Sequence, residues 1–106
     1  MHLIYVTFPH LDDAKKIIKI LLEENLIACA NVFSPHIALY EWEGKIMEEQ
    51  EVAALLKTTS SFKVETRIVE LHPYECPCII GIEPDHIHQK FKTWITECVE
   101  KEPLSF

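Results

Sequence analysis

The sequence has little glycine: only Gly44 and Gly81 occur among its 106 residues. Loops that bind phosphate groups need several glycines close together, so the common nucleotide-binding motifs are excluded. None of the four serines lies in the glycine-flanked motif of serine hydrolases. No apolar run reaches about 18 residues, and the first residues lack the basic flank of a signal peptide, so we expect no membrane partner.

Positive charge is also scarce. Ten Lys and Arg residues stand against 17 Asp and Glu residues, which gives a formal net charge of −7. Such a chain repels phosphate backbones, so we expect no nucleic-acid partner. These features favour a cytoplasmic protein whose four cysteines are free thiols. The length and the 48% hydrophobic content predict a single domain over residues 1–106.

Strand-like and helix-like patterns alternate along the chain. Apolar runs rich in branched and aromatic residues predict strands, and apolar residues spaced by three and four predict helices. Asn25 is a plausible left-handed helix terminator, Ser60 or Ser61 a cap of the second helix, and Asp85 a cap of the last helix. The expected elements are strand 3–8, helix 11–24, an extended stretch 31–43 broken near Ser34-Pro35, strand 46–58, a helix ending at 71, strand 79–82 and a C-terminal helix after 85. The apolar residues on one face of the C-terminal helix are Ile87, Phe91, Trp94, Ile95 and Cys98.

This βαββαβ order with an added C-terminal helix predicts a ferredoxin-like α/β (α+β) sandwich. The stretches 31–43 and 46–58 form a long hairpin around the turn at Gly44. Two helices cover one face of the sheet, and the other face would expose apolar side chains to water. The sequence therefore predicts a closed homo-oligomer.

Three segments are more specific than this pattern. They are residues 40–46 (YEWEGKI), residues 70–77 (ELHPYECP) and residues 28–31 (ACAN). Together they resemble the divalent-cation tolerance protein CutA family over roughly residues 4–99. The resemblance implies a homotrimer in which the long hairpin pairs with a neighbouring subunit, and a link to tolerance of divalent metals, copper especially. The architecture is also similar to that of the PII signal proteins, which bind small effectors between subunits.

The sharpest cluster of metal-binding side chains comprises His72, Glu75, Cys76 and Cys78. Thiolate and imidazole ligands suit copper or zinc, and residues 76 and 78 of an extended segment point to the same side. The alternative is that Cys78 begins a buried strand and packs as a small hydrophobic residue.

Some bacterial members of the family carry a cysteine at the end of the first strand and a His-His pair before Pro-Tyr. Here the corresponding residues are Val6 and Leu71, and only His72 matches. The family's copper site is therefore not reproduced residue by residue in this chain.

Tyr40, Lys57 and Tyr74 match the family's signature and could line an inter-subunit cleft for an anion. Lys57 could instead pair with a glutamate such as Glu75. Trp42 is predicted to anchor the trimer interface, because large aromatic side chains fill such interfaces.

The remaining cysteines and histidines have plainer interpretations. Cys29 and Cys98 are expected to pack as small apolar residues, and the histidines other than His72 to lie on the surface or at helix ends. No set of residues predicts catalysis, so we expect no enzyme activity. The favoured hypothesis is a trimer that binds divalent or soft transition-metal ions and contributes to metal tolerance. The alternatives are a PII-like effector-binding module and a structural trimeric scaffold.

Overall fold

An antiparallel sheet and three helices make up residues 1–100, the part of the chain that the structure, a computed structural model, describes. Their order confirms the predicted ferredoxin-like α+β fold with an added C-terminal helix. The elements are β1 (His2–Phe8), α1 (Leu11–Glu23), β2 (Cys29–Val32), β3 (His36–Trp42), β4 (Lys45–Thr58), α2 (Ser61–Leu71), β5 (Ile79–Ile82) and α3 (Gln89–Glu100).

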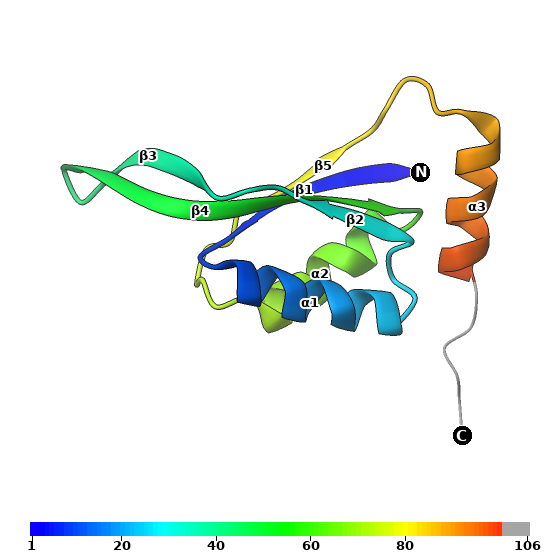
Figure 1. Cartoon of the computed structure of the whole chain (residues 1–106), viewed down its shortest axis with the longest axis horizontal. Helices are drawn as coiled ribbons and strands as arrows, with labels where there is room; N and C mark the ends of the chain where they lie inside the picture. Colours follow the sequence, from blue (N-terminus) through cyan, green and yellow to red (C-terminus); the bar gives the residue numbers. More distant parts are fainter. Residues whose placement is uncertain (101–106) are drawn as a thin grey trace.

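The sheet has the strand order β2-β4-β1-β5, and β3 pairs with β4 alone. Helices α1 and α2 both lie on one face of this sheet (Figure 1). Side chains alternate between the two faces of a strand, so Ile4, Val6 and Phe8 of β1 point toward the helices and are buried. We call the opposite face the open face; its side chains include Tyr5 and Ile80, and Ile80 is 51% exposed.

Two short turns behave as the sequence predicts. Asn25 adopts a left-handed conformation, with a φ of 56°, and ends α1. The Leu26 N–H donates to the Leu21 carbonyl oxygen at 3.0 Å, which closes a Schellman motif. In the hairpin, Glu43 and Gly44 both have positive φ, as a two-residue type I′ turn requires.

The hairpin of β3 and β4 extends well beyond the layer formed by α1 and α2 (Figure 1). The predicted break near Ser34-Pro35 separates β2 from β3. Lys45–Thr58 forms one continuous strand, so its first half belongs to the projecting hairpin and its second half to the central sheet. The hairpin therefore exposes both of its faces in a single subunit.

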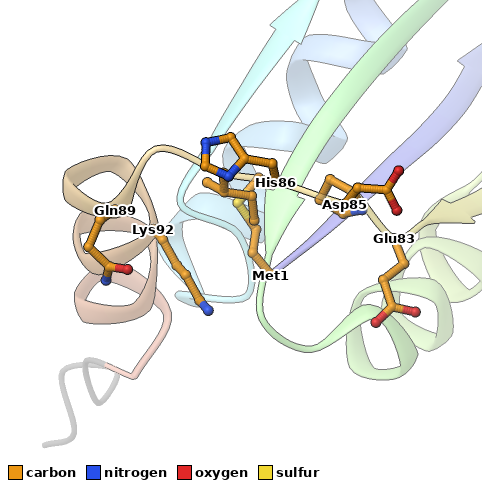
Figure 2. A pocket seen from close by; sticks show the side chains of 8 residues that line it. Met1, Glu83, Asp85, His86, Gln89 and Lys92 are labelled. Atoms are coloured by element: carbon orange, nitrogen blue, oxygen red, sulfur yellow. The ribbon is translucent and has the colours of Figure 1, made fainter.

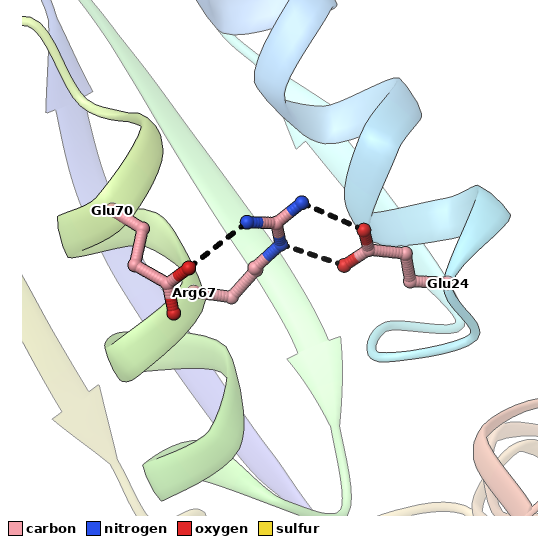
Figure 3. Close-up of polar contacts among 3 residues, drawn as sticks. All are labelled: Glu24, Arg67 and Glu70. Atoms are coloured by element: carbon pink, nitrogen blue, oxygen red, sulfur yellow. Dashed lines mark hydrogen bonds and ion pairs between the residues drawn. The ribbon is translucent and has the colours of Figure 1, made fainter.

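An ion-pair network joins the two helices below the sheet (Figure 3). Arg67 on α2 donates from Nε and Nη2 to the Glu24 carboxylate, which directly follows α1, with both distances 2.8 Å. It also donates from Nη1 to Glu70 at 3.1 Å. This bidentate contact holds the end of α1 against the middle of α2 and lowers the pKa of Glu24.

Two predictions about helix starts need correction. Helix α3 begins at Gln89, because its first backbone bond runs from the Lys92 N–H to the His88 oxygen, so Asp85 is not its cap. Ser60 occupies the N-cap position of α2, but its side chain makes no capping bond, and the Thr58 hydroxyl oxygen accepts the Ser60 N–H at 3.0 Å.

The predicted apolar face of α3 is only partly buried. Ile95 is fully buried, whereas Phe91 and Trp94 stack on each other at 5.9 Å and stay 38% and 45% exposed. The reason is that α3 packs on one end of the sheet rather than along its whole face (Figure 1). Among residues 1–100 no helix has the length and apolar content needed to cross a membrane.

Candidate functional site

A hollow of about 510 Å³ lies between the open face and the projecting hairpin. It gathers five of the residues that the sequence singled out, although they come from β3 and from the segment before β5. These are Tyr40, Trp42, Tyr74, Cys76 and Cys78. The remaining lining residues are Tyr5, Thr7, His36, Ile37, Ala38, Leu39 and Glu51. The hollow is therefore largely apolar, with thiols and one carboxylate among its polar groups.

Cys76 and Cys78 lie in the segment that leads into β5, and both are exposed. The Thr7 N–H donates to the Cys78 carbonyl oxygen at 3.4 Å, which ties this segment to β1. Both cysteines line the hollow, in agreement with the expectation that they point to one side. Among the side chains that the structure describes, those of residues 1–99, however, no three His, Cys, Asp or Glu are grouped so that they could hold a metal ion.

His72 is buried immediately after α2, and both of its ring nitrogens have backbone partners. Nε2 donates to the Thr7 carbonyl oxygen at 2.7 Å, and Nδ1 accepts the Tyr74 N–H at 3.0 Å. The ring also stacks on Phe8, with 5.3 Å between centroids. This pattern requires the neutral Nε2–H tautomer. Metal binding by His72 would break one of these bonds, so the geometry favours a structural role, and the metal-ligand prediction stays untested.

Tyr74 bonds to Glu51, a carboxylate outside the clusters predicted from the sequence. Its hydroxyl donates to Glu51 Oε2 at 3.1 Å. Burial, followed by this hydrogen bond and the charge of Glu51, raises the pKa of Tyr74 to about 12. His36 lies 4.0 Å from Glu51 Oε1 across the β3–β4 ladder. Residues 36 and 51 are equidistant from the turn at 43–44, so the hairpin register could have revealed this pair in the sequence.

Tyr40 faces the same group of acidic side chains from β3. It is 41% exposed, and a hydrogen bond to Glu49 raises its pKa. Tyr40 and Tyr74 thus stand near each other at the hollow, as the cleft prediction requires. In the isolated subunit the Tyr74 hydroxyl donates to Glu51, whereas Tyr40 has Glu49 as its acidic neighbour.

Lys57 does not join Tyr40 and Tyr74. It lies at the far end of β4, where it is 9% exposed and pairs across the sheet with Cys29. Its ammonium group donates to the side-chain oxygen of Asn31. No ion pair forms between Lys57 and Glu75 or any other carboxylate within residues 1–99. The suggestion that Lys57 pairs with Glu75 is therefore wrong.

The last two predicted residues lie at the surface. Glu75 is exposed and does not line the hollow. Trp42 sits at the hairpin turn with 62% of its surface exposed, so in one subunit it has little of the packing that an interface anchor would gain in an assembly.

A second cavity, of about 320 Å³, lies where the chain enters α3 (Figure 2). Gln89 and Lys92 border it from the helix, and Glu83, Asp85 and His86 from the preceding segment. His86 and His88 are outside the helix and exposed, in agreement with their predicted surface position. None of the predicted metal or cleft residues reaches this cavity.

The fold and the hollow together define a class: small ferredoxin-like α+β proteins with a projecting hairpin. Residues 2–98 match the model of the CutA1 divalent ion tolerance protein family. The divalent-cation tolerance protein CutA of Pyrococcus horikoshii is 46% identical over 103 residues, which cover 95% of this chain and all of the relative. The chain therefore belongs to the CutA1 divalent ion tolerance protein family, as the resemblance predicted.

Two solved structures extend this similarity. The periplasmic divalent cation tolerance protein CutA from Archaeoglobus fulgidus is 41% identical with a TM-score of 0.90, over 94% of this chain and 100% of the other. The PII-like protein CutA from Nostoc sp. PCC 7120 is 28% identical with a TM-score of 0.86, over 94% and 98%. The family is one of non-enzymatic divalent-cation tolerance proteins, which confirms the expectation that the chain is not an enzyme. The cytoplasmic location stays a prediction, since one relative is named periplasmic.

Proposed function

We propose that this chain is a homotrimeric metal-tolerance protein that binds soft transition-metal ions at the hollow under its hairpin. The observation that carries the proposal is the exposure of two thiols, Cys76 and Cys78, on the wall of one hollow. Thiolates prefer Cu(I) and Zn(II) to Mg(II) and Ca(II), which take oxygen ligands.

The exposed apolar surface of the hairpin supports assembly. Ile37, Leu39 and Ile46 are 58%, 66% and 85% exposed, and Trp42 is 62% exposed. On the open face, Ile80 and Ile82 add two more apolar side chains on the edge strand β5. Exposed apolar side chains on both faces of the hairpin and on β5, together with unpaired strand edges, favour pairing with further copies of the chain. The number of copies, three, is what the family resemblance implies.

Light scattering tests the assembly. We expect a mass three times the 12.3 kDa of one chain. An interface of this obligate kind buries more than about 2,000 Å², so the trimer should persist at micromolar concentration. A folded monomer under those conditions would overturn the trimer but leave the metal proposal open.

Isothermal titration calorimetry of the reduced protein with Zn(II) and with chelator-buffered Cu(I) tests the metal site. We expect the Cys76→Ser/Cys78→Ser variant to lose one binding event. The matched control is Lys63→Gln, which changes an exposed charge on α2 without altering the hollow. If the double variant binds every metal as the native protein does, the two thiols are structural.

A PII-like effector-binding function is the second candidate. It is favoured by the size of the hollow and by the similarity to a Nostoc relative named PII-like. Lys57, the cation expected to hold an anionic effector, does not line the hollow, which weakens this candidate. A thermal-shift comparison of metals with nucleotides separates the two, because only a ligand of the native state raises the melting temperature.

A further inference from the structure

A second pair of cysteines, Cys29 and Cys98, belongs to the other end of the sheet and to the helix that packs there. Cys29 begins β2 and lies opposite Lys57 of β4. The neighbours of Lys57 in β4, Leu56 and Thr58, are fully buried on the helix-covered side, so Lys57 projects from the open face. Side chains directly opposite in an antiparallel pair share a face, which places Cys29 on the open face beside Lys57.

Helix α3 covers this corner of the open face and brings the second thiol. The helix packs against β4, and Ile95 is fully buried there. Cys98 follows Ile95 by three residues and therefore lies on the same side of the helix. Burial raises the pKa of the Cys29 thiol, the charge of Lys57 lowers it, and the charge of Cys98 raises it, which agrees with the close placement of all three groups.

Lys57 gives this corner an unusual electrostatic property. Its side chain is 9% exposed, yet its only hydrogen-bond acceptor among the described side chains of residues 1–99 is the neutral amide oxygen of Asn31. No carboxylate of the same residues lies within ion-pair distance. A buried ammonium without a counter-charge is destabilising, so this position favours a bound group with net negative charge.

We propose that Cys29 and Cys98 bind one Cu(I) ion as a two-coordinate bis-thiolate whose charge is balanced by Lys57. On binding, each thiol releases one proton to solvent and each sulfur forms one bond to copper, with no change of oxidation state. Two thiolates and Cu(I) carry a net charge of −1, which the ammonium of Lys57 neutralises. This site is separate from the hollow that holds Cys76 and Cys78.

The chemistry of the ligands favours Cu(I) over Zn(II). A structural zinc site uses four ligands in a tetrahedron, and among the described side chains of residues 1–99 no third His, Cys, Asp or Glu joins these two thiols in a metal-binding group. Soft thiolate ligands select Cu(I), which accepts a linear pair.

The test is an anaerobic titration of reduced protein with Cu(I) against a chromophoric Cu(I) chelator such as bicinchoninate. The Cys29→Ser/Cys98→Ser variant should lose one equivalent of tightly bound copper per chain. The Cys76→Ser/Cys78→Ser variant is the matched control, and it should retain that equivalent even if the proposed site in the hollow fails. If the first variant binds copper with native stoichiometry and affinity, the proposal is overturned.

Lys57 provides an independent test. Lys57→Met keeps the length of the side chain and removes its charge, so Cu(I) affinity at this site should fall by about tenfold or more. Lys57→Arg should retain most of the affinity. Equal affinity in Lys57→Met and the native protein would refute the charge-balancing role. Should the double cysteine variant not fold, Cys98→Ala alone should lose the same equivalent, and X-ray absorption on Cu(I)-loaded protein should show two sulfur neighbours.

Discussion

His72 offers a direct test of whether the His72–Pro73–Tyr74 segment serves the fold or a metal ion. Substitution by alanine removes a ring that bonds to β1 through the Thr7 oxygen and to its own segment through the Tyr74 N–H. It also removes the stacking partner of Phe8. The substitution therefore removes contacts that hold the end of α2 against the sheet, and it leaves the thiols of the hollow unchanged.

The magnitude follows from these contacts. An unpaired buried backbone group costs about 1–3 kcal/mol, and two such groups are left by the substitution. The lost aromatic contact adds about 0.5–1.5 kcal/mol. Water can reach part of the opened space, so we expect a loss near the lower end of the sum, about 3 kcal/mol. Glu75→Ala, an exposed substitution three residues away, should change stability by no more than about 0.5 kcal/mol.

Urea unfolding at one fixed protein concentration measures both variants, since the stability of an oligomer depends on concentration. The structural role is refuted if His72→Ala unfolds at the same urea concentration as Glu75→Ala. His72→Gln, which offers a donor and an acceptor, should recover part of the loss. If His72→Gln folds normally but loses its bound metal, His72 is a ligand after all.

Three further predictions follow from the hairpin, the hollow and the helix pair. Trp42→Ala should weaken assembly by about 3 kcal/mol per subunit, since roughly 120 Å² of exposed indole would no longer be buried in the trimer. Sedimentation at falling protein concentrations measures this loss of assembly free energy, and an unchanged trimer would place Trp42 outside the interface. Tyr74 should be the last tyrosine to ionise, because its pKa is raised to about 12. The stability from its hydrogen bond to Glu51 is complete below pH 10 and is lost as the pH rises toward 12. A Tyr74→Phe variant should lack the last ionisation step in an ultraviolet titration of the tyrosines. Arg67→Met should lower the free energy of unfolding by up to about 1 kcal/mol at pH 7. Because the pKa of Glu24 in the folded protein is lowered from 4.5, the difference from the native protein should vanish as acid protonates Glu24. A difference that does not depend on pH would point to packing instead.

The fold could be predicted because its signals are local. Asn25 ends α1 within one residue of the expected position, and Gly44 sets the hairpin turn. The start of α3 could not be predicted in this way. Asp85 is a strong capping residue, but the helix begins at Gln89 and is docked through Ile95 against the sheet. A tertiary contact overrides the local capping preference in that case.

The site was predictable where its residues are neighbours in sequence and not where partners come from other strands. Cys76 and Cys78 share the hollow because alternation along an extended chain is a local rule. The roles of His72 and Lys57 depend on Thr7 and Asn31, which lie 65 and 26 residues away. Sequence spacing carries no information on such buried polar contacts, so these partners of His72 and Lys57 could not be predicted.

The positions of the two thiol pairs give them different consequences for the assembly. If the hairpin of one subunit covers the hollow of another and the covered hollow holds metal more tightly, binding at Cys76 and Cys78 favours the trimer by linkage. Metal bound at Cys29 and Cys98 joins α3 to the sheet of a single subunit, so it stabilises the fold without shifting the monomer–trimer equilibrium. Sedimentation with and without Cu(I) in each double cysteine variant therefore separates the two sites. Copper should protect the trimer from dissociation on dilution only in the variant that keeps Cys76 and Cys78. The same protection in the variant that lacks these two cysteines would show that the hollow is not the metal site of the interface.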